Sequence, residues 1–486
     1  MKCWWTKELT VIQKARNRIS ALKYKWRGLP EHPSHEEYRS ITKKYARAIE
    51  KAKADHWSEW IKHIGGDDIW SIHNYMRANP TDYGKQRIPN IMKADGTYAC
   101  TNSDKAQCLA ETFFPPVQPP LPDKHQFKEK HPPTTHESSF PRFTTERVAE
   151  MLSRVNPYKA PGPLGISNSI LKCCANILAP HLADIYQAIC DLHHYPERFT
   201  NIHQIVLPKP GHPSYEVLNA YHPIALIETI VKVQSTIITE NLSYECKHHN
   251  LLPDLQFGGC PGRSTTDALH YVEQYIKNAW RRNEVVSALF LNIQAAFPNM
   301  QKDCLIANMK ARNIAIEYHN YVDLILTQCN IQLRFDDHTS QPFSPPNGCC
   351  QGCPLSMLLY VIYNTPLLQV ANPASPNECI VGFIDNTTLL ARGKNFKEAH
   401  ATLKDMMEHT NRVFEWSSTF NLPLEMNKLA LVNFTQSATK ARDVTCLTLM
   451  QPDHSIIHKH DIEVSLSTKL LGVILDARLN WSAQHE

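Results

Sequence analysis

Three polar side chains stand at the ends of predicted strands, where they could bind cations. Asn292 lies in an apolar run, 285–293, that is typical of a strand buried on both faces. Asp385 and Asn386 join two β-rich runs, a pattern that indicates a hairpin. Hard divalent cations prefer anionic oxygens, which Asp385 offers, whereas an asparagine offers only a neutral carbonyl oxygen. The alternative is that all three are ordinary turn residues, because Asp and Asn tolerate left-handed backbone angles.

The elements that would position these side chains alternate between strands and helices from residue 202 onward, which predicts a mixed α/β (α+β) fold. Runs of β-forming residues indicate strands at 204–207, 285–293, 331–336, 379–384, 387–390 and 429–434. Apolar residues at helical spacing indicate helices at 227–248, 265–280, 302–313, 318–327, 355–371 and 396–420. The polar, histidine-containing stretch 454–460 is expected to be a solvated loop.

The N-terminal region predicts a pair of basic helices. Residues 6–64 have helical spacing on both sides of a break at Pro30 to Pro33. The second helix carries a basic face formed by Lys43, Lys44, Arg47, Lys51 and Lys53. Such a face can bind a phosphate backbone, although a merely solvated face is the more common case. Residues 113–143 are dense in proline and are expected to form an extended connection.

Composition is that of a globular protein of more than one lobe. The chain has 486 residues, of which 42% are hydrophobic and 20% charged, and a formal net charge of +4. Its 15 cysteines are scattered, which favours free thiols over a zinc site. The first 20 residues lack the apolar core of a signal peptide, and no apolar stretch is long enough to cross a membrane. A cytoplasmic or nuclear protein with no membrane partner is therefore expected.

Six further motifs occur in a fixed order around the three strand-end residues. They are KAPGPLGI at 159–166, LPKPG at 207–211, AYHPIAL at 220–226, QFGGCPGRSTTD at 256–267, NGCCQGCPLS at 347–356 and LGVILD at 471–476. With the strand-end residues, this series resembles the reverse transcriptase of non-LTR, LINE-type retrotransposons, especially those of fungi. The resemblance spans nearly the whole chain, which looks like an internal piece of such a polyprotein.

The resemblance implies a right-hand polymerase fold with fingers and palm, a truncated thumb and an N-terminal helical hairpin. The implied divisions are a basic helical hairpin at 1–65, a proline-rich connecting segment at 66–143, fingers at 144–284, palm at 285–440, and a primer-grip hairpin with the start of the thumb at 441–486. The implied partners are an RNA template, a DNA primer and deoxynucleotide triphosphates. The implied cofactor is Mg²⁺ or Mn²⁺.

The resemblance also implies roles for individual residues. Asn292, Asp385 and Asn386 match the three metal-binding aspartates of the family, so only Asp385 remains as an anionic metal ligand. Lys428 matches a lysine that protonates pyrophosphate in the family. The residues that match nucleotide-binding positions are Phe297, Gln351, Gly352, Lys209, His222 and Arg263.

Several departures from the family pattern predict a degenerate copy with negligible RNA-templated DNA synthesis. Two metal-binding carboxylates are missing at Asn292 and Asn386, and arginines of the family are replaced at His222 and Cys260. An alternative is a non-enzymatic nucleic-acid-binding protein derived from a retroelement. A third reading is weak activity from Asp385 together with a neighbouring carboxylate such as Asp476.

Overall fold

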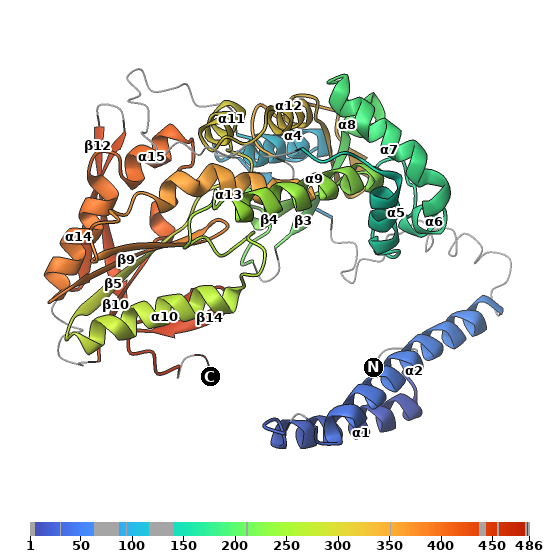
Figure 1. The fold of residues 1–486 in the computed structure, drawn as a ribbon, viewed down its shortest axis with the longest axis horizontal. Coiled ribbons are helices and arrows are strands. Elements are labelled where there is room, and N and C mark those ends of the chain that lie inside the picture. Colours follow the sequence, from blue (N-terminus) through green and yellow to red (C-terminus); the bar gives the residue numbers. More distant parts are fainter. Residues whose placement is uncertain are drawn as a thin grey trace. The chain divides into compact units, whose positions relative to one another are not determined.

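The chain folds into two compact units, Met1–Gln86 and Arg87–Glu486 (Figure 1). The computed structural model describes residues 5–29, 31–62, 87–93, 95–115, 140–209, 212–349, 351–436, 444–453, 456–481 and 484.

The first unit is a helical hairpin of α1 (Lys7–Lys25) and α2 (Ser34–Lys62). The Thr6 hydroxyl begins α1 by accepting the backbone N–H of Leu9. Leu9 and Ile12 are buried between the helices, and the Lys23 ammonium lies 4.5 Å from the centre of the Tyr38 ring. The predicted pair of helices is confirmed, with the break at the predicted prolines.

The second unit mixes helices with sheets, as predicted. Its strands are β1 (Ile91–Met92), β2 (Tyr98–Ala99), β3 (Asn201–Pro208), β4 (Tyr221–Leu226), β5 (Val285–Leu291), β6 (Asn330–Phe335), β7 (His338–Thr339), β8 (Glu378–Phe383), β9 (Asn386–Gly393), β10 (Ala430–Phe434), β11 (Cys446–Asp453), β12 (Ile456–Ser465), β13 (Ser467–Leu470) and β14 (Val473–Asp476). Its helices are α4 (Asn102–Phe113), α5 (Thr145–Arg154), α6 (Asn168–Cys173), α7 (Ala175–Asp191), α8 (Glu197–Thr200), α9 (Thr229–His248), α10 (Thr265–Arg281), α11 (Lys302–Ala311), α12 (Ile316–Thr327), α13 (Pro354–Leu368), α14 (Phe396–Glu408) and α15 (Val413–Thr419), with single 3₁₀ turns at Leu218–Ala220 and Met426–Lys428.

A six-stranded sheet with the order β11-β12-β10-β5-β9-β8 forms the centre of this unit. Every residue of β5 is buried, so the predicted central strand is confirmed. Alternate side chains of β5 belong to two different hydrophobic cores, because successive side chains of a strand point to opposite faces. Val286, Ala288 and Phe290 join a core with α10, whereas Leu289 and Leu291 join the main core, which also includes α13 and α14. Figure 1 shows α10 on one side of the sheet and α14 on the other.

A second sheet with the order β4-β3-β6-β7 lies in the same unit. β3 pairs antiparallel with β4 and parallel with β6, although β6 follows β5 in sequence. The chain thus leaves the six-stranded sheet after β5, adds β6 and β7 to the smaller sheet and returns at β8. Because of this crossover, β6 shares a sheet with β3 although it lies in the range 285–440.

Two stretches differ from the sequence expectation. The polar stretch 454–460, expected as a loop, contributes residues 456–460 to β12, which pairs with β11 over eight residues. Most of β12 is exposed, so it lacks the apolar alternation that reveals a half-buried strand. Part of the range 66–143 is also folded, since β1, β2 and α4 belong to the second unit.

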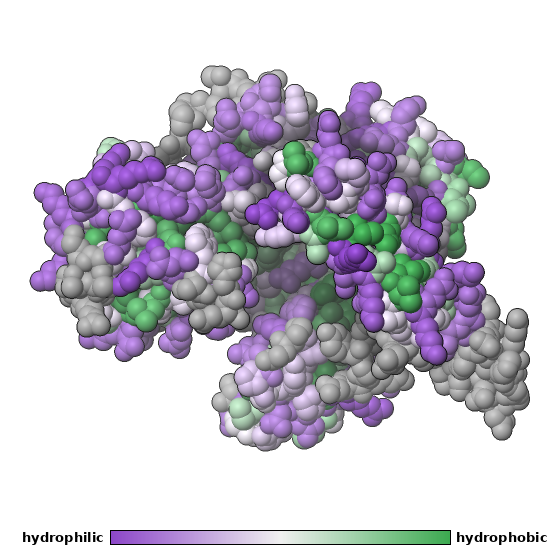
Figure 2. Space-filling view, turned by 90° about the horizontal axis from the view of Figure 1, so that it is seen from below, coloured by the Kyte–Doolittle hydropathy of each residue, from purple (hydrophilic) through white to green (hydrophobic). Residues whose placement is uncertain are grey.

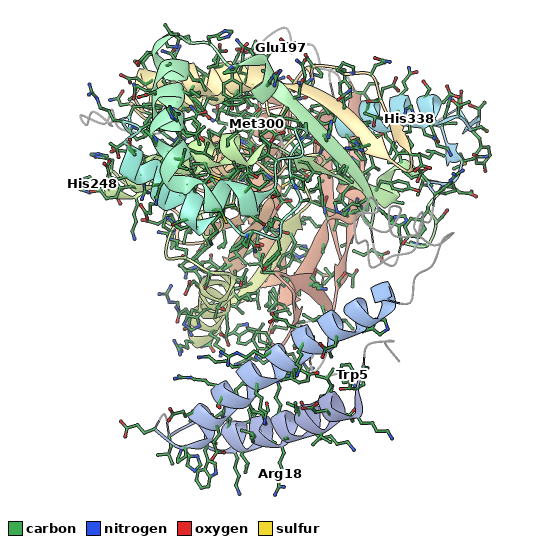
Figure 3. All side chains as sticks on the ribbon, turned by 90° about the vertical axis from the view of Figure 1, so that its right-hand side faces the viewer. Trp5, Arg18, Glu197, His248, Met300 and His338 are labelled. Atoms are coloured by element: carbon green, nitrogen blue, oxygen red, sulfur yellow. The ribbon has the colours of Figure 1, made fainter. Side chains whose placement is uncertain are left out.

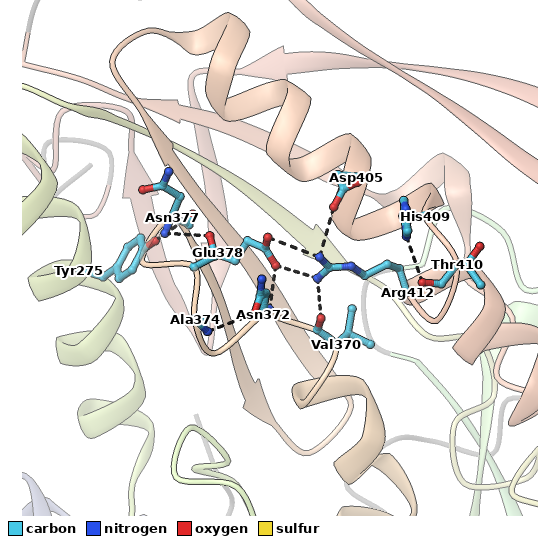
Figure 4. Close-up of polar contacts among 11 residues, drawn as sticks. Tyr275, Val370, Asn372, Ala374, Asn377, Glu378, Asp405, His409, Thr410 and Arg412 are labelled. Atoms are coloured by element: carbon cyan, nitrogen blue, oxygen red, sulfur yellow. Dashed lines mark hydrogen bonds and ion pairs between the residues drawn. The ribbon is translucent and has the colours of Figure 1, made fainter. Parts of the chain in front are cut away.

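The predicted helix 396–420 is divided into α14 and α15 by a turn with Asn411 at φ 59°. After this turn, Arg412 reaches the start of β8 (Figure 4). Its guanidinium lies 2.7 Å from the Glu378 carboxylate and 3.2 Å from the Asp405 carboxylate, and it also donates to the Val370 carbonyl. This buried network ties α14, α15 and α13 to the strand that leads to Asp385.

Removing Arg412 is expected to cost roughly 3 kcal/mol of unfolding free energy, because Arg412→Met leaves a mostly buried Glu378 carboxylate unpaired. The measurement is urea unfolding. The double change with Glu378→Gln should cost less than Arg412→Met alone. The control is Lys404→Met, which breaks the partly exposed Lys404–Glu408 pair on α14 and should cost below about 1 kcal/mol. An equal loss in both single variants would contradict the prediction.

The surface and cysteines fit the composition. On the face drawn in Figure 2, hydrophilic side chains cover most of the outside and apolar ones gather in small patches. The 13 cysteines among the described residues are all free thiols, and four of them are buried. Within the ranges that the structure describes, no helix is long and apolar enough to cross a membrane.

Candidate active site at the strand ends

The β8–β9 hairpin carries Asp385, and its turn lies one residue earlier than the sequence suggests. Phe383 pairs with Asn386, so the two turn residues are Ile384 and Asp385 rather than Asp385 and Asn386. Ile384 takes the left-handed conformation with φ 58°, which is rare for a β-branched residue. Such strained residues cluster at functional sites and cost about 1–3 kcal/mol each. The shift places Asp385 in the turn of the β8–β9 hairpin and Asn386 at the start of β9.

Neighbouring segments hold this strained turn in place. The Asn364 side chain, on the buried helix α13, donates to the Ile384 carbonyl at 3.4 Å. On the other side, the Phe257 N–H donates to the Gly382 carbonyl at 2.8 Å. Gly258 approaches so closely that a Cβ there would lie 2.6 Å from the Ile384 nitrogen. The QFGGCPGRSTTD motif therefore includes the backbone support of the hairpin.

Asn292 joins Asp385 and Asn386 at the same edge of the sheet. Leu291 pairs with Thr387, and the next step of this antiparallel register sets Asn292 opposite Asn386. Directly opposite residues have Cα atoms about 5 Å apart. The Asn386 amide also donates to the Asp385 carboxylate at 3.3 Å. The structure thus brings together the three predicted residues, which we call the strand-end cluster: Asn292, Asp385 and Asn386.

Asp385 is the charged member of the strand-end cluster. Solvent reaches its carboxylate, but protein atoms surround it on most sides, and this loss of hydration raises its pKa above the ordinary 3.8. Its neighbour Tyr360 is fully buried, and the Tyr360 hydroxyl has no hydrogen-bond partner in the described part of the chain. Burial and then the charge of Asp385 raise the pKa of Tyr360, so the phenol lies within electrostatic reach of the carboxylate.

Asp385→Asn is expected to stabilise the fold at neutral pH. A carboxyl group with a raised pKa in the folded chain adds stability below its ordinary pKa and loses that contribution as the pH rises through the raised value. At about pH 7 the ionised carboxylate is therefore a cost that asparagine removes, and the gain should disappear near pH 3. Urea unfolding at both pH values measures this, with Asp184→Asn at an exposed position of α7 as the control. A gain that is the same at both pH values would contradict the stated cause.

Glu425 is a carboxylate that sequence reasoning missed. Its backbone N–H donates to the Asn292 carbonyl at 2.9 Å, which places it beside the strand-end cluster. Its side chain holds the ammonium of Lys428 at 2.7 Å. The i, i+3 spacing of Glu425 and Lys428 was the only sequence signal for this carboxylate, because it allows an ion pair between the two side chains. Asp476, the alternative considered from sequence, instead accepts the backbone N–H groups of residues 478, 480 and 481 after β14.

The described residues of the 347–352 loop contact both the segment that follows β5 and the smaller sheet. Gly348 donates to the Met300 carbonyl at 2.9 Å, and Cys349 donates to the Phe297 carbonyl at 3.1 Å. The Phe297 ring lies 4.9 Å from the ring of Tyr360, centre to centre. At the other end of the loop, the Gln351 carbonyl accepts the Ala225 N–H of β4 at 2.9 Å. Gly352 has φ 130°, and a Cβ there would lie 2.6 Å from the Ala225 carbonyl oxygen.

The remaining candidates lie in two places. Lys209, directly after β3, lies close to His222 of β4, which pairs with Leu207. Burial first and then the charge of Lys209 lower the pKa of His222. Lys209 is exposed, but its ammonium donates to the Asn219 carbonyl at 2.8 Å. Arg263 lies apart from them, where its guanidinium donates to the carbonyls of Asp254 and Gln256. Through these two contacts Arg263 stabilises the 254–257 turn, which bonds to the β8–β9 hairpin through Phe257.

Comparisons with known proteins identify the family of this chain. The family model described as reverse transcriptase (RNA-dependent DNA polymerase) matches residues 207–475, which include the whole strand-end cluster. Three similar relatives come from Drosophila melanogaster: the "Probable RNA-directed DNA polymerase from transposon BS", the corresponding X-element protein and the RNA-directed DNA polymerase from mobile element jockey. They are 24%, 24% and 22% identical over 86%, 93% and 90% of this chain.

The aligned regions make up 45%, 49% and 47% of these relatives, so the chain spans about half their length. The family match extends over more than half of this chain and includes β5, the β8–β9 hairpin and the 347–352 loop. The chain therefore belongs to the reverse transcriptase family and carries a domain of the non-LTR, LINE type.

Proposed function

We propose that this chain is a retrotransposon reverse-transcriptase domain in which RNA-templated DNA synthesis has been lost. The six-stranded sheet with α10, α13 and α14 corresponds to the palm, and the sheet of β3, β4, β6 and β7 with its helices corresponds to the fingers. β13 and β14 correspond to the primer-grip hairpin and the start of the thumb. The RNA template, DNA primer and deoxynucleotide triphosphates of the family are the proposed ligands.

The charge of the strand-end cluster is the observation that carries the proposal. Asn292, Asp385 and Asn386 supply one negative charge where the family uses three. Two divalent cations about 4 Å apart repel each other strongly, and one carboxylate offsets little of that repulsion. Among the described residues, no group of three or more His, Cys, Asp or Glu side chains could hold a metal ion. The residues present do not fit the metal pair of the family.

Glu425 does not by itself replace a lost ligand. Its carboxylate pairs with the Lys428 ammonium at 2.7 Å, so Lys428 would compete with a cation for it. Lys428 is the proposed proton donor to pyrophosphate, and its ammonium is held in this ion pair. To act on pyrophosphate, Lys428 would first have to leave Glu425.

The nucleotide side of the site is changed as well. His222 lies beside the Lys209 ammonium, and its pKa is lowered, so its imidazole is neutral near pH 7. A neutral imidazole lacks the bidentate charge of an arginine for phosphate oxygens. Phe297, Gln351 and Gly352 are proposed to keep their places against the sugar and base. These positions can bind a nucleotide without the metal pair.

A primer-extension assay tests the proposal. The chain is incubated with a labelled DNA primer on an RNA template, four deoxynucleotide triphosphates and Mg²⁺ or Mn²⁺. The matched control is Asp385→Asn, which removes the last carboxylate of the strand-end cluster. The unmodified chain is expected to extend the primer no more than this control. Extension that Asp385→Asn abolishes would overturn the proposed loss of catalysis.

A second candidate function, nucleic-acid binding without catalysis, is favoured by the distribution of charge. Residues 1–62 contain 15 Lys and Arg against 7 Asp and Glu, although the whole chain has a net charge of only +4. Phosphate contacts release counterions, so binding to RNA should weaken steeply as salt rises. Binding that is absent or insensitive to salt would argue against this function.

A further inference from the structure

The N-terminal hairpin combines two features that together suit one kind of ligand. The first is a line of cations on α1, which we call the α1 stripe: Lys7, Lys14, Arg18 and Lys25. The spacing of 7, 4 and 7 residues keeps these side chains on one face over roughly 27 Å of helix. All four are exposed, and Figure 3 shows Arg18 projecting from α1 on the side away from α2.

The α1 stripe is electrostatically unbalanced. Glu8 is the only acidic residue in Lys7–Lys25. No ion pair joins these four cations to a carboxylate of the described residues, and the apolar face of α1 is used against α2 through Leu9 and Ile12. When Lys and Arg side chains without carboxylate partners contact a polyphosphate, they release the cations condensed on it, and this release favours binding. The stripe therefore fits the backbone of a nucleic acid.

The second feature is a pair of aromatic side chains with an adjacent cation where α1 ends, which we call the tip: Tyr24, Trp26 and Arg27. Tyr24 is 69% exposed and Trp26 is 38% exposed. The Arg27 guanidinium lies 4.5 Å from the centre of the Tyr24 ring, and His32 stacks on Trp26 at 4.9 Å. The Lys25 ammonium lies 5.6 Å from the Trp26 ring. Tyr24 thus has a cation over its ring, and Trp26 has both a cation over its ring and a stacked imidazole that helps to fix its orientation.

We infer that the tip stacks on unpaired bases and that the α1 stripe follows the phosphates, so that the hairpin binds single-stranded nucleic acid. Exposed rings next to cations are the usual means of binding single strands, since every base offers a flat face for stacking. A paired duplex buries those faces and would engage only the stripe. A membrane surface is the less suitable partner, because an interfacial helix needs an apolar face along its length, and two apolar residues of α1, Leu9 and Ile12, are already buried.

This inference rests on the nucleic-acid binding proposed above and adds the strandedness and the residues. It is tested with the full chain and two fluorescein-labelled probes, an unstructured single-stranded RNA and an RNA duplex with the same number of phosphates. Fluorescence anisotropy gives the affinities over a range of salt. The tip variant is Tyr24→Leu with Trp26→Leu, which keeps apolar bulk and removes the rings. Its control is Tyr98→Leu, an exposed tyrosine of β2 in the second unit.

The tip variant is expected to bind the single strand at least about tenfold more weakly, because stacking contributes about 1–3 kcal/mol per base. Its affinity for the duplex and its salt dependence should stay unchanged. A stripe variant, with Lys7, Lys14, Arg18 and Lys25 changed to Gln, should weaken both probes and lower the salt slope for the single strand by roughly 3.

The outcomes separate the two levels of the proposal. If the stripe variant alone weakens binding and the tip variant behaves like Tyr98→Leu, the inference about the tip is wrong while nucleic-acid binding stands. If neither variant changes binding, the N-terminal unit neither stacks on bases through the tip nor binds nucleic acid at all. A tip variant that loses binding to anionic lipid vesicles, but not to the single strand, would identify a membrane partner and also overturn the inference.

Discussion

Restoring both missing carboxylates, by Asn292→Asp with Asn386→Asp, is expected to raise RNA-templated primer extension at least about a thousandfold. Metal ions contribute several kcal/mol to the transition state of phosphoryl and nucleotidyl transfer, and about 1.4 kcal/mol corresponds to a tenfold change in rate. The register sets Asn292 opposite Asn386, next to Asp385, so both new carboxylates would enter the strand-end cluster. The measurement is primer extension with Mg²⁺ or Mn²⁺, together with Mn²⁺ affinity from calorimetry.

The control for this prediction changes the same net charge elsewhere. Asn102→Asp with Asn176→Asp introduces two exposed carboxylates in the first turns of α4 and α7, outside the N-terminal unit, and should have no effect. Tighter Mn²⁺ binding without extension would show that other departures also block the reaction, and His222→Arg with Cys260→Arg is then the next addition. Unchanged Mn²⁺ affinity in the restored variant would contradict the assignment of Asn292 and Asn386 as former ligands.

Gly348→Ala is expected to destabilise the chain by about 4 kcal/mol, an effect with two physical causes. Gly348 has φ 89°, a conformation that costs a non-glycine residue about 1–3 kcal/mol. A Cβ there would also lie 2.5 Å from the Pro298 carbonyl oxygen and 2.6 Å from its Cα, and overpacking of this kind costs about 1–3 kcal/mol. Because both contacts are with backbone atoms, no side-chain rotation relieves them.

Two other glycines separate these causes in the same urea-unfolding experiment. Gly165 has φ 72° with open space around it, so Gly165→Ala reports the conformational cost alone. Gly28 has open space and no positive φ, so Gly28→Ala should be nearly neutral. The expected order of destabilisation is Gly348, then Gly165, then Gly28. A loss for Gly348→Ala no larger than that for Gly165→Ala would show that the 347–352 loop gives way around the new methyl group.

The candidate site shows where sequence reasoning succeeds. β5 is recognisable because both of its faces are buried and its residues are continuously apolar, and the β8–β9 hairpin is recognisable from two β-rich runs around a short connection. Their pairing places Asn292, Asp385 and Asn386 together as the motif order implied. The turn was misplaced by one residue, because Asp and Asn are the usual left-handed residues and Ile384 is held there by tertiary contacts with Asn364 and Gly258.

Other features could not be read from local patterns. Glu425 meets Asn292 through a backbone contact between segments more than 100 residues apart. Arg263, which resembles a nucleotide-binding position, is held by carbonyls of its own turn. β12 is too polar and exposed to show strand alternation. The division of 396–420 into α14 and α15 accompanies the Arg412 network, whose partner Glu378 lies on another element.

The sequence by itself determined the family, the central strand and the helical pair at the N-terminus, and it predicted a single carboxylate in the strand-end cluster, because motifs, apolar periodicity and side-chain charge are properties of short segments. Only the tertiary structure decided which residue forms the hairpin tip, which carboxylate stands beside Asn292 and where Lys428 finds its partner. It also decided that β6 joins β3 and not β5. These outcomes depend on packing and hydrogen bonding between segments far apart in the chain, and no local pattern records them.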